Sequence, residues 1–157
     1  MNKILLFLLI NAFLWAQTID FKEEKHLSAL NHSVIKKGSI QFEGDSIKIA
    51  YAQSDTILTY TPNRLVIQNK SDIQEINLNQ HLDKEIYFLL LKDIFFDNQH
   101  TIETYFFIEQ QPNKTILTPK NMLSNFIEKI EYKKSNKLEF LKLYFVNSDR
   151  IFIEQIN

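Results

Sequence analysis

The chain has 157 residues, of which 45% are hydrophobic and 24% charged, with a formal net charge of −1 and no cysteine. A chain of this length can bury one hydrophobic core, and the absence of cysteine excludes a disulfide framework and thiol chemistry. The charges are spread along the chain, which argues against a nucleic-acid partner, because such binding needs clustered lysine and arginine.

The first segment with a clear signature is the apolar run 4–16, ILLFLLINAFLWA, which follows Lys3. Its length is typical of the hydrophobic region of a secretory signal peptide and is well short of the ~20 residues that span a bilayer. We predict a signal peptide over 1–16, cleaved after Ala16, with export to the periplasm and a single mature domain over 17–157. An uncleaved membrane anchor is the alternative.

The stretch 21–42, FKEEKHLSALNHSVIKKGSIQF, scatters apolar residues among lysines and glutamates. We interpret it as the first edge of a half-polar sheet. From residue 39 apolar and polar residues alternate, as in a half-buried strand, and Gly44-Asp45 is a two-residue turn signal, so 38–52 is predicted to form a hairpin. The alternating apolar residues are Ile40, Phe42, Ile47, Ile49 and Tyr51.

Further strands are predicted where short apolar and β-branched runs end at turn residues. These strands are 55–61, 64–69, 72–77, 101–110, 114–118, 126–134, 137–146 and 149–156. Within 137–146 the apolar phase shifts between Phe140 and Leu141, which predicts a β-bulge that bends the strand. The pattern as a whole favours a strongly curved antiparallel sheet.

One segment, 79–93 (NQHLDKEIYFLLLKD), has helical instead of alternating periodicity. Asn79 stands at the position of an N-cap, and the apolar face consists of Leu82, Ile86, Leu89 and Leu90. A lone helix in such a chain must cover an apolar surface. We therefore predict a mainly β (α+β) fold, in which the curved sheet forms an incomplete barrel with a helical cover over an apolar cavity.

These elements, taken in order, resemble the periplasmic outer-membrane lipoprotein carriers of the LolA-like family, as a divergent member. The resemblance covers essentially the whole of 17–157. It is carried by the strand led by Phe21, the strand from Gly38 to Phe42, the strand 63–69, the helix after Asn79 and the segment TILTPK at 115–120.

The chain also departs from the family pattern at identifiable positions. It has Glu23 where the family usually has glutamine. It has Lys48, Ala50 and Tyr51 in the strand where the family carries an arginine, which helps to hold the helical lid shut, and a tryptophan. These departures leave open another lipid as the cargo.

The resemblance implies a carrier, or chaperone, that binds acyl chains of lipoproteins or of a related lipid for transfer toward the outer membrane. It implies an inner-membrane donor, an outer-membrane acceptor, a monomer and no cofactor. The predicted cavity wall is Phe42, Ile47, Ile49, Tyr51, Leu65, Ile67, Phe106, Ile108, Ile130 and Tyr132, and the predicted lid is Leu82, Ile86, Leu89 and Leu90. A plain hydrophobic core would explain the same residues, because periodicity reports burial and not a ligand.

Two other classes of function remain to be weighed. His81 and Glu85 are four residues apart on the predicted helix, but no third metal ligand is identifiable and no HExxH or GxSxG motif occurs. We therefore expect no metal site and no enzymatic activity. The alternative to a carrier is a structural or adaptor protein of the envelope that binds partner proteins through its sheet. An adaptor should have a solid interior, whereas a carrier should have a continuous apolar cavity.

Overall fold

The computed structural model describes residues 17–157, so the predicted signal peptide over 1–16 lies outside the described residues. The strands are β1 (Gln17–Leu27), β2 (His32–Glu43), β3 (Ser46–Tyr51), β4 (Thr56–Thr61), β5 (Arg64–Asn69), β6 (Asp72–Asn77), β7 (Phe106–Gln111), β8 (Lys114–Pro119), β9 (Ile127–Lys134), β10 (Leu138–Phe145) and β11 (Arg150–Gln155). The helices are α1 (Leu82–Phe95) and α2 (His100–Tyr105), with short 3-10 helices at Ser28–Leu30 and Asn121–Asn125.

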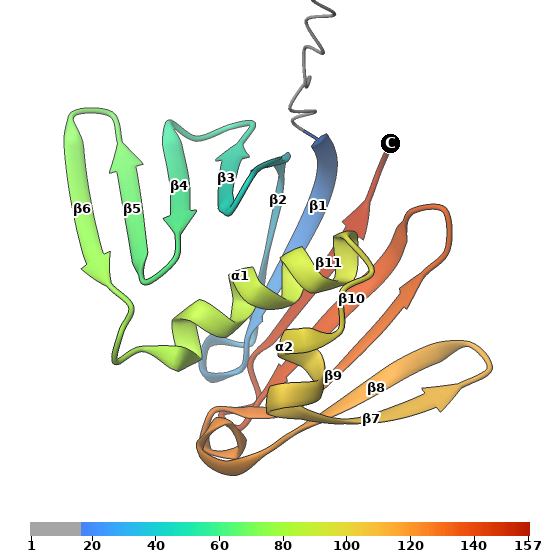
Figure 1. The fold of residues 1–157 in the computed structure, drawn as a ribbon. Coiled ribbons are helices and arrows are strands. Elements are labelled where there is room, and N and C mark those ends of the chain that lie inside the picture. The colour runs from blue at the N-terminus through green and yellow to red at the C-terminus, as the bar shows by residue number, and fades with distance from the viewer. Residues whose placement is uncertain (1–16) are drawn as a thin grey trace, which may run out of the picture.

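All the strands belong to one antiparallel sheet, in the order β6-β5-β4-β3-β2-β1-β11-β10-β9-β8-β7. The sheet curves around α1, and its two edges, β6 and β7, are not paired with each other (Figure 1). This confirms the predicted fold class, a strongly curved antiparallel sheet that forms an incomplete barrel with a helical cover. Neither α-helix in the described part of the chain is long and apolar enough to cross a membrane.

The alternation of apolar residues predicted most of the strands well. From β3 to β6 and from β8 to β11 the predicted bounds agree with the observed ones to about one residue. This is within the usual uncertainty in where an element ends. The pairing of β9 with β10 shifts register between Leu138 and Phe140 and again between Tyr144 and Phe145. The predicted bulge in 137–146 is thus confirmed, and it bends this half of the sheet.

The segment after α1 differs from the prediction. Residues 101–110 were expected to form one strand, but α2 occupies His100–Tyr105 and β7 begins only at Phe106. The cause is a capping contact, since a carboxylate oxygen of Asp93 accepts hydrogen bonds from the backbone N–H groups of Thr101 (2.7 Å) and Ile102 (3.2 Å). The donors at the start of a helix have no partner within the helix, so this contact favours the helical conformation.

Two smaller expectations were also wrong. The stretch 21–42 is not an edge of the sheet, because β1 pairs with β2 on one side and with β11 on the other. Asn79 does not cap the helix, since α1 starts at Leu82 with His81 at the N-cap position and no side-chain capping bond. Both corrections concern contacts that the local pattern does not encode.

The strands β2 and β3 approach each other closely at Gly38. A Cβ atom added there would lie 2.3 Å from the carbonyl oxygen of Ala50 and 3.0 Å from the ring of Phe21. The glycine is therefore required by the distance between β2 and β3 and not by its backbone angles. The concave face of the sheet is the face on which α1 packs (Figure 1).

Candidate functional site

The predicted wall residues lie on the concave face, where cross-strand pairs such as Phe42–Ile47 and Tyr51–Gly38 bring them to the same side. Six of them are buried, with exposed fractions of 7% or less: Phe42, Ile47, Ile49, Leu65, Phe106 and Ile130. Tyr51, Ile67 and Tyr132 are half-buried and pack against this cluster. Ile108 is 37% exposed on the edge strand β7, so it lies outside the covered part of the face.

The predicted lid residues lie on α1 as expected. Ile86 and Leu90 are buried, and Leu82 and Leu89 are half-buried against the core cluster. The prediction missed four further residues of α1 that are also buried, namely Phe88, Leu91, Ile94 and Phe95. Phe88, Leu91 and Phe95 have the spacing i, i+3, i+7, a signal of a helical face that the sequence already contained.

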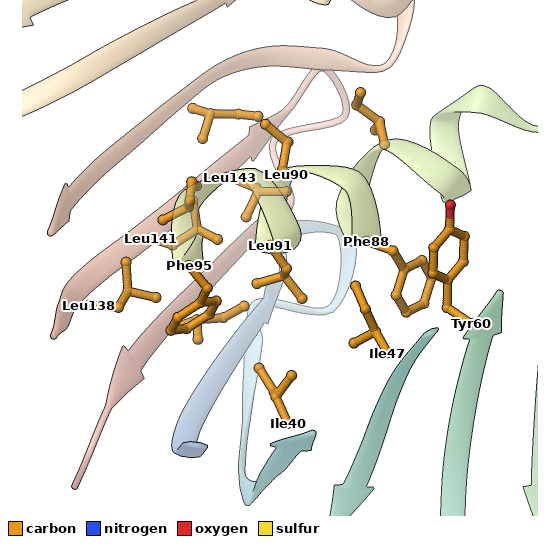
Figure 2. Close-up of a cluster of buried hydrophobic side chains, with 14 of the residues drawn as sticks. Ile40, Ile47, Tyr60, Phe88, Leu90, Leu91, Phe95, Leu138, Leu141 and Leu143 are labelled. Atoms are coloured by element: carbon orange, nitrogen blue, oxygen red, sulfur yellow. The ribbon is translucent and has the colours of Figure 1, made fainter. Parts of the chain in front are cut away.

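Side chains of α1 fill the space above the strands (Figure 2). The Phe88 ring stacks on the Tyr60 ring with centroids 4.8 Å apart, and the Phe95 ring lies 5.2 Å from that of Phe42. Leu90 and Leu91 are both completely buried. The predicted apolar wall and the predicted lid therefore meet directly, with the lid in a closed position.

Polar contacts tie α1 to the strands around it. A carboxylate oxygen of Glu85 accepts hydrogen bonds from the hydroxyl of Tyr60 (3.0 Å) and from the backbone N–H of Asn63 (3.2 Å). Near the other end of the helix, Lys92 forms an ion pair with Asp45, in the turn between β2 and β3. The ammonium group of Lys134 donates a hydrogen bond to the carbonyl oxygen of Phe95, 2.9 Å away.

These contacts give Glu85 a structural role. Its partners are Tyr60 and Asn63, while His81 is exposed at the N-cap position of α1. Within 17–157 there is no group of three or more histidine, cysteine, aspartate or glutamate side chains that could hold a metal ion. The hydrogen bonds of Glu85 thus belong to the packing of α1 on the sheet.

One buried group on the concave face is a carboxylate. Glu23, on the central strand β1, is 8% exposed, and both its carboxylate oxygens lie 3.4 Å from the hydroxyl of Tyr51. The ammonium group of Lys36 lies over the Tyr51 ring, 4.9 Å from its centroid. Burial raises the pKa of Glu23, and the nearby charge of Lys36 opposes this shift.

The hydroxyl of Tyr87, on α1, belongs to the same neighbourhood. Burial raises its pKa well above the usual value, and Glu23 and Tyr51 raise it further. The hydroxyl oxygen is inaccessible to solvent and has no hydrogen-bond partner within the described residues. Glu23, Tyr51 and Tyr87 are called the polar cluster below. Tyr51 is one of the predicted wall residues, whereas no sequence pattern pointed to Glu23 or Tyr87 as a site residue.

Open space in the structure lies mostly elsewhere. Five depressions of the described residues have volumes between about 210 and 370 Å³. Of the predicted wall, only Tyr51 and Tyr132 line any of these five. The apolar cavity expected of an open carrier is thus occupied by the side chains of α1.

Comparison with known proteins adds likeness in structure but none in sequence. No family model matches the chain, and no curated protein matches it. The chain is similar in structure to a LolA superfamily protein from Nitrosomonas europaea, with a TM-score of 0.42 and 7% sequence identity over 90% of this chain and 84% of that chain.

Proposed function

We propose that the chain is a non-enzymatic carrier, exported to the periplasm, that binds acyl chains of a lipoprotein or a related lipid on its concave face. The observation that supports this proposal is the cover of that face. A continuous apolar surface, formed by residues of β1 to β5 and of β7 to β11, is covered chiefly by the 14-residue helix α1. Displacement of one helix would make this surface available to a ligand.

The free energies of burial favour an exchange of α1 for an acyl ligand on the concave face. Burying one leucine, isoleucine or phenylalanine side chain contributes roughly 1.5–3 kcal/mol. The side chains of α1 at Phe88, Leu90, Leu91, Ile94 and Phe95 would together contribute on the order of 10 kcal/mol on that scale. An acyl chain gains about 0.8 kcal/mol per buried methylene, so a chain of ordinary length could replace them at little net cost. Such near balance is what a reversible cover requires.

The proposed carrier works as a monomer without a cofactor, between a donor at the inner membrane and an acceptor at the outer membrane. The contacts of Glu85, Lys92 and Lys134 would hold α1 closed while the face is empty. These contacts lie near the two ends of the helix, so its apolar middle could leave the sheet once they part.

A second candidate, an adaptor that binds partner proteins through its sheet, is favoured by different observations. The interior is filled, as expected of an adaptor. The described sheet also ends in two unpaired edge strands, and Phe107 on β7 is 65% exposed. An unpaired edge can accept a strand from another protein.

Uptake of an acyl probe with the helix free or fixed separates the two candidates. The chain has no cysteine, so the double variant Asp45→Cys, Lys92→Cys can be bridged specifically with a flexible bis-maleimide. We expect the unbridged double variant to bind a fluorescent fatty acyl probe and the bridged one to lose most of this binding. The single variant Lys92→Cys, treated in the same way, is the control.

The results have distinct meanings. Probe binding by the unbridged protein but not by the bridged one supports a carrier in which α1 must move before the ligand binds. Equal binding by the bridged and unbridged proteins contradicts displacement of α1. An absence of binding by the wild-type protein, together with no lipid retained in native mass spectrometry, would contradict the carrier and favour the adaptor.

A further inference from the structure

The polar cluster interrupts an apolar row on the central strand. Ile19, Phe21 and Glu23 are successive inward-facing residues of β1, and all three are buried. On the next strand Gly38 lies opposite Phe21, and the Tyr51 ring makes an edge contact with Phe21, with centroids 5.9 Å apart. A carboxylate at this position is costly for a face whose role is purely apolar packing.

The polar groups in this cluster are incompletely paired. An ionised carboxylate has about four lone-pair sites, but the described side chains offer Glu23 only the hydroxyl of Tyr51, at 3.4 Å, which is long for a hydrogen bond between oxygens. The buried hydroxyl of Tyr87 has no partner within 17–157. Because buried polar groups in proteins are nearly always paired, this cluster has unused hydrogen-bonding capacity.

We propose that Glu23 and Tyr51 form a head-group site for an acyl ligand with a neutral, hydroxyl-bearing head, such as a monoacylglycerol. In the closed state α1 imitates this ligand, since its apolar side chains cover the face and it carries a buried hydroxyl, that of Tyr87, with no hydrogen-bond partner within 17–157. When α1 is displaced, the ligand's hydroxyl takes the place of the Tyr87 hydroxyl. This inference rests on the proposed function, because it assigns a specificity to the same face.

The charges around the site select a neutral head. An anionic head, such as a carboxylate, would be placed beside the buried Glu23, where repulsion is weakly screened. A cationic head would meet the Lys36 ammonium group, which already lies over the Tyr51 ring. An ester without a hydroxyl could accept a hydrogen bond but could not donate one to the Glu23 carboxylate. A hydroxyl group on the ligand can both accept and donate a hydrogen bond. The hydroxyl of Tyr87 on α1 has the same two capacities.

Competition among three ligands with the same acyl chain tests the proposal. The ligands are 1-monooleoylglycerol, methyl oleate and oleate, each used below its aggregation limit to displace a fluorescent acyl probe from the full mature protein. We expect monooleoylglycerol to compete about 10-fold more strongly than the other two, which corresponds to one hydrogen bond to a charged or buried partner.

Two variants test whether the preference for monooleoylglycerol arises at Glu23 and Tyr51. Glu23→Met and Tyr51→Phe each remove a polar group and keep the volume of the side chain, and each should reduce the preference to about 2-fold or less, with methyl oleate binding retained. Tyr144→Phe is the matched control, because Tyr144 follows the buried Leu143 on β10 and so faces away from the concave side, and it should keep the full preference. Circular dichroism and thermal unfolding establish that each variant is folded.

The outcomes distinguish this inference from the function on which it rests. Binding of all three ligands with equal affinity, or a preference that persists in both Glu23→Met and Tyr51→Phe, overturns the head-group site and leaves the carrier standing. Failure of all three ligands to displace the probe, with no direct binding by native mass spectrometry, overturns both. If Glu23→Met does not fold, Tyr51→Phe decides, since it removes only a hydroxyl.

Discussion

Two regions of the concave face are buried by the same helix in different ways. In the first, Leu90 and Leu91 of α1 are completely inaccessible and pack among apolar side chains of the strands (Figure 2). In the second, the polar cluster of Glu23, Tyr51 and Tyr87 is also buried, but its hydrogen bonds are long or missing. The first region stabilises the closed position of α1, whereas the second opposes it, because buried polar groups without partners cost free energy.

This difference suggests why one helix can serve as a removable cover. If the face were apolar throughout, only the burial of apolar area would hold α1 in place. Such a face would not discriminate between acyl ligands that differ in their head groups. A cluster that is incompletely paired lowers the stability of the closed state and gains partners only when a suitable ligand replaces the helix. The predictions below test the two regions separately.

The largest effect is expected in the apolar region. Leu91→Ala should lower the free energy of unfolding by about 2–5 kcal/mol, the usual cost of removing a completely buried leucine side chain. Leu89→Ala, on the same helix but only half-buried, should cost clearly less. Urea denaturation of both variants measures the difference. Equal losses would mean that Leu91 does not lie in the tightly packed part of the face.

The next largest effect concerns the close approach of β2 and β3 beside the polar cluster. Gly38→Ala places a methyl group 2.3 Å from the backbone oxygen of Ala50, so the strands must move apart at a cost of about 1–3 kcal/mol. Gly44→Ala is the control, because that glycine has a positive φ of 57° but open space around it, and it should cost about 1 kcal/mol from its backbone angle. A smaller loss at Gly38 than at Gly44 in thermal unfolding would contradict the close approach.

Most of the strands and the curvature were predictable because most strands alternate buried residues with more exposed ones. The alternation of Ile47, Ile49 and Tyr51 reports this directly, and the phase shift after Phe140 revealed the bulge. The start of α2 was not predictable in this way, because it depends on the Asp93 carboxylate, which approaches Thr101 only in the folded chain. The central place of β1 likewise depends on pairing with β11, at the far end of the sequence.

The candidate site was predictable in its apolar part only. Periodicity identified Ile47 and Leu90 as buried, but burial does not distinguish a ligand-binding wall from a core. Glu23 lies in the charged run FKEEKH, where only its spacing of two from Phe21 indicated that this glutamate, and not Glu24, faces inward. The missing partner of Tyr87 is a property of the assembled face, so no sequence pattern could reveal it.

A smaller effect is expected from the contact that holds the N-terminal half of α1. Tyr60→Phe removes the hydrogen bond to Glu85 but keeps the stacking on Phe88, so it should cost about 1 kcal/mol. If this contact holds the cover, amide hydrogen exchange in α1 should accelerate more than exchange in β10. Tyr144→Phe, outside the concave face, is the control. Uniform acceleration throughout the protein would show that Tyr60 supports the whole fold and not the cover in particular.

The smallest effect is a pH dependence that belongs to the polar cluster alone. Because burial raises the pKa of Glu23 against the opposing charge of Lys36, the folded protein keeps this proton to higher pH than the unfolded chain does. The contribution of the protonated group to stability is therefore complete below the ordinary glutamate pKa of 4.5 and is lost as the pH rises through the folded-state value. Glu23→Gln is neutral at every pH, so its stability relative to wild type should increase as the pH rises from about 4 to about 8.

Urea denaturation at a series of pH values measures this pH dependence, with Glu75→Gln, at an exposed position in a surface ion pair, as the control. Parallel stability curves for Glu23→Gln and wild type would show that the carboxyl is solvated enough to ionise freely, and the polar cluster would then no longer oppose closure of α1.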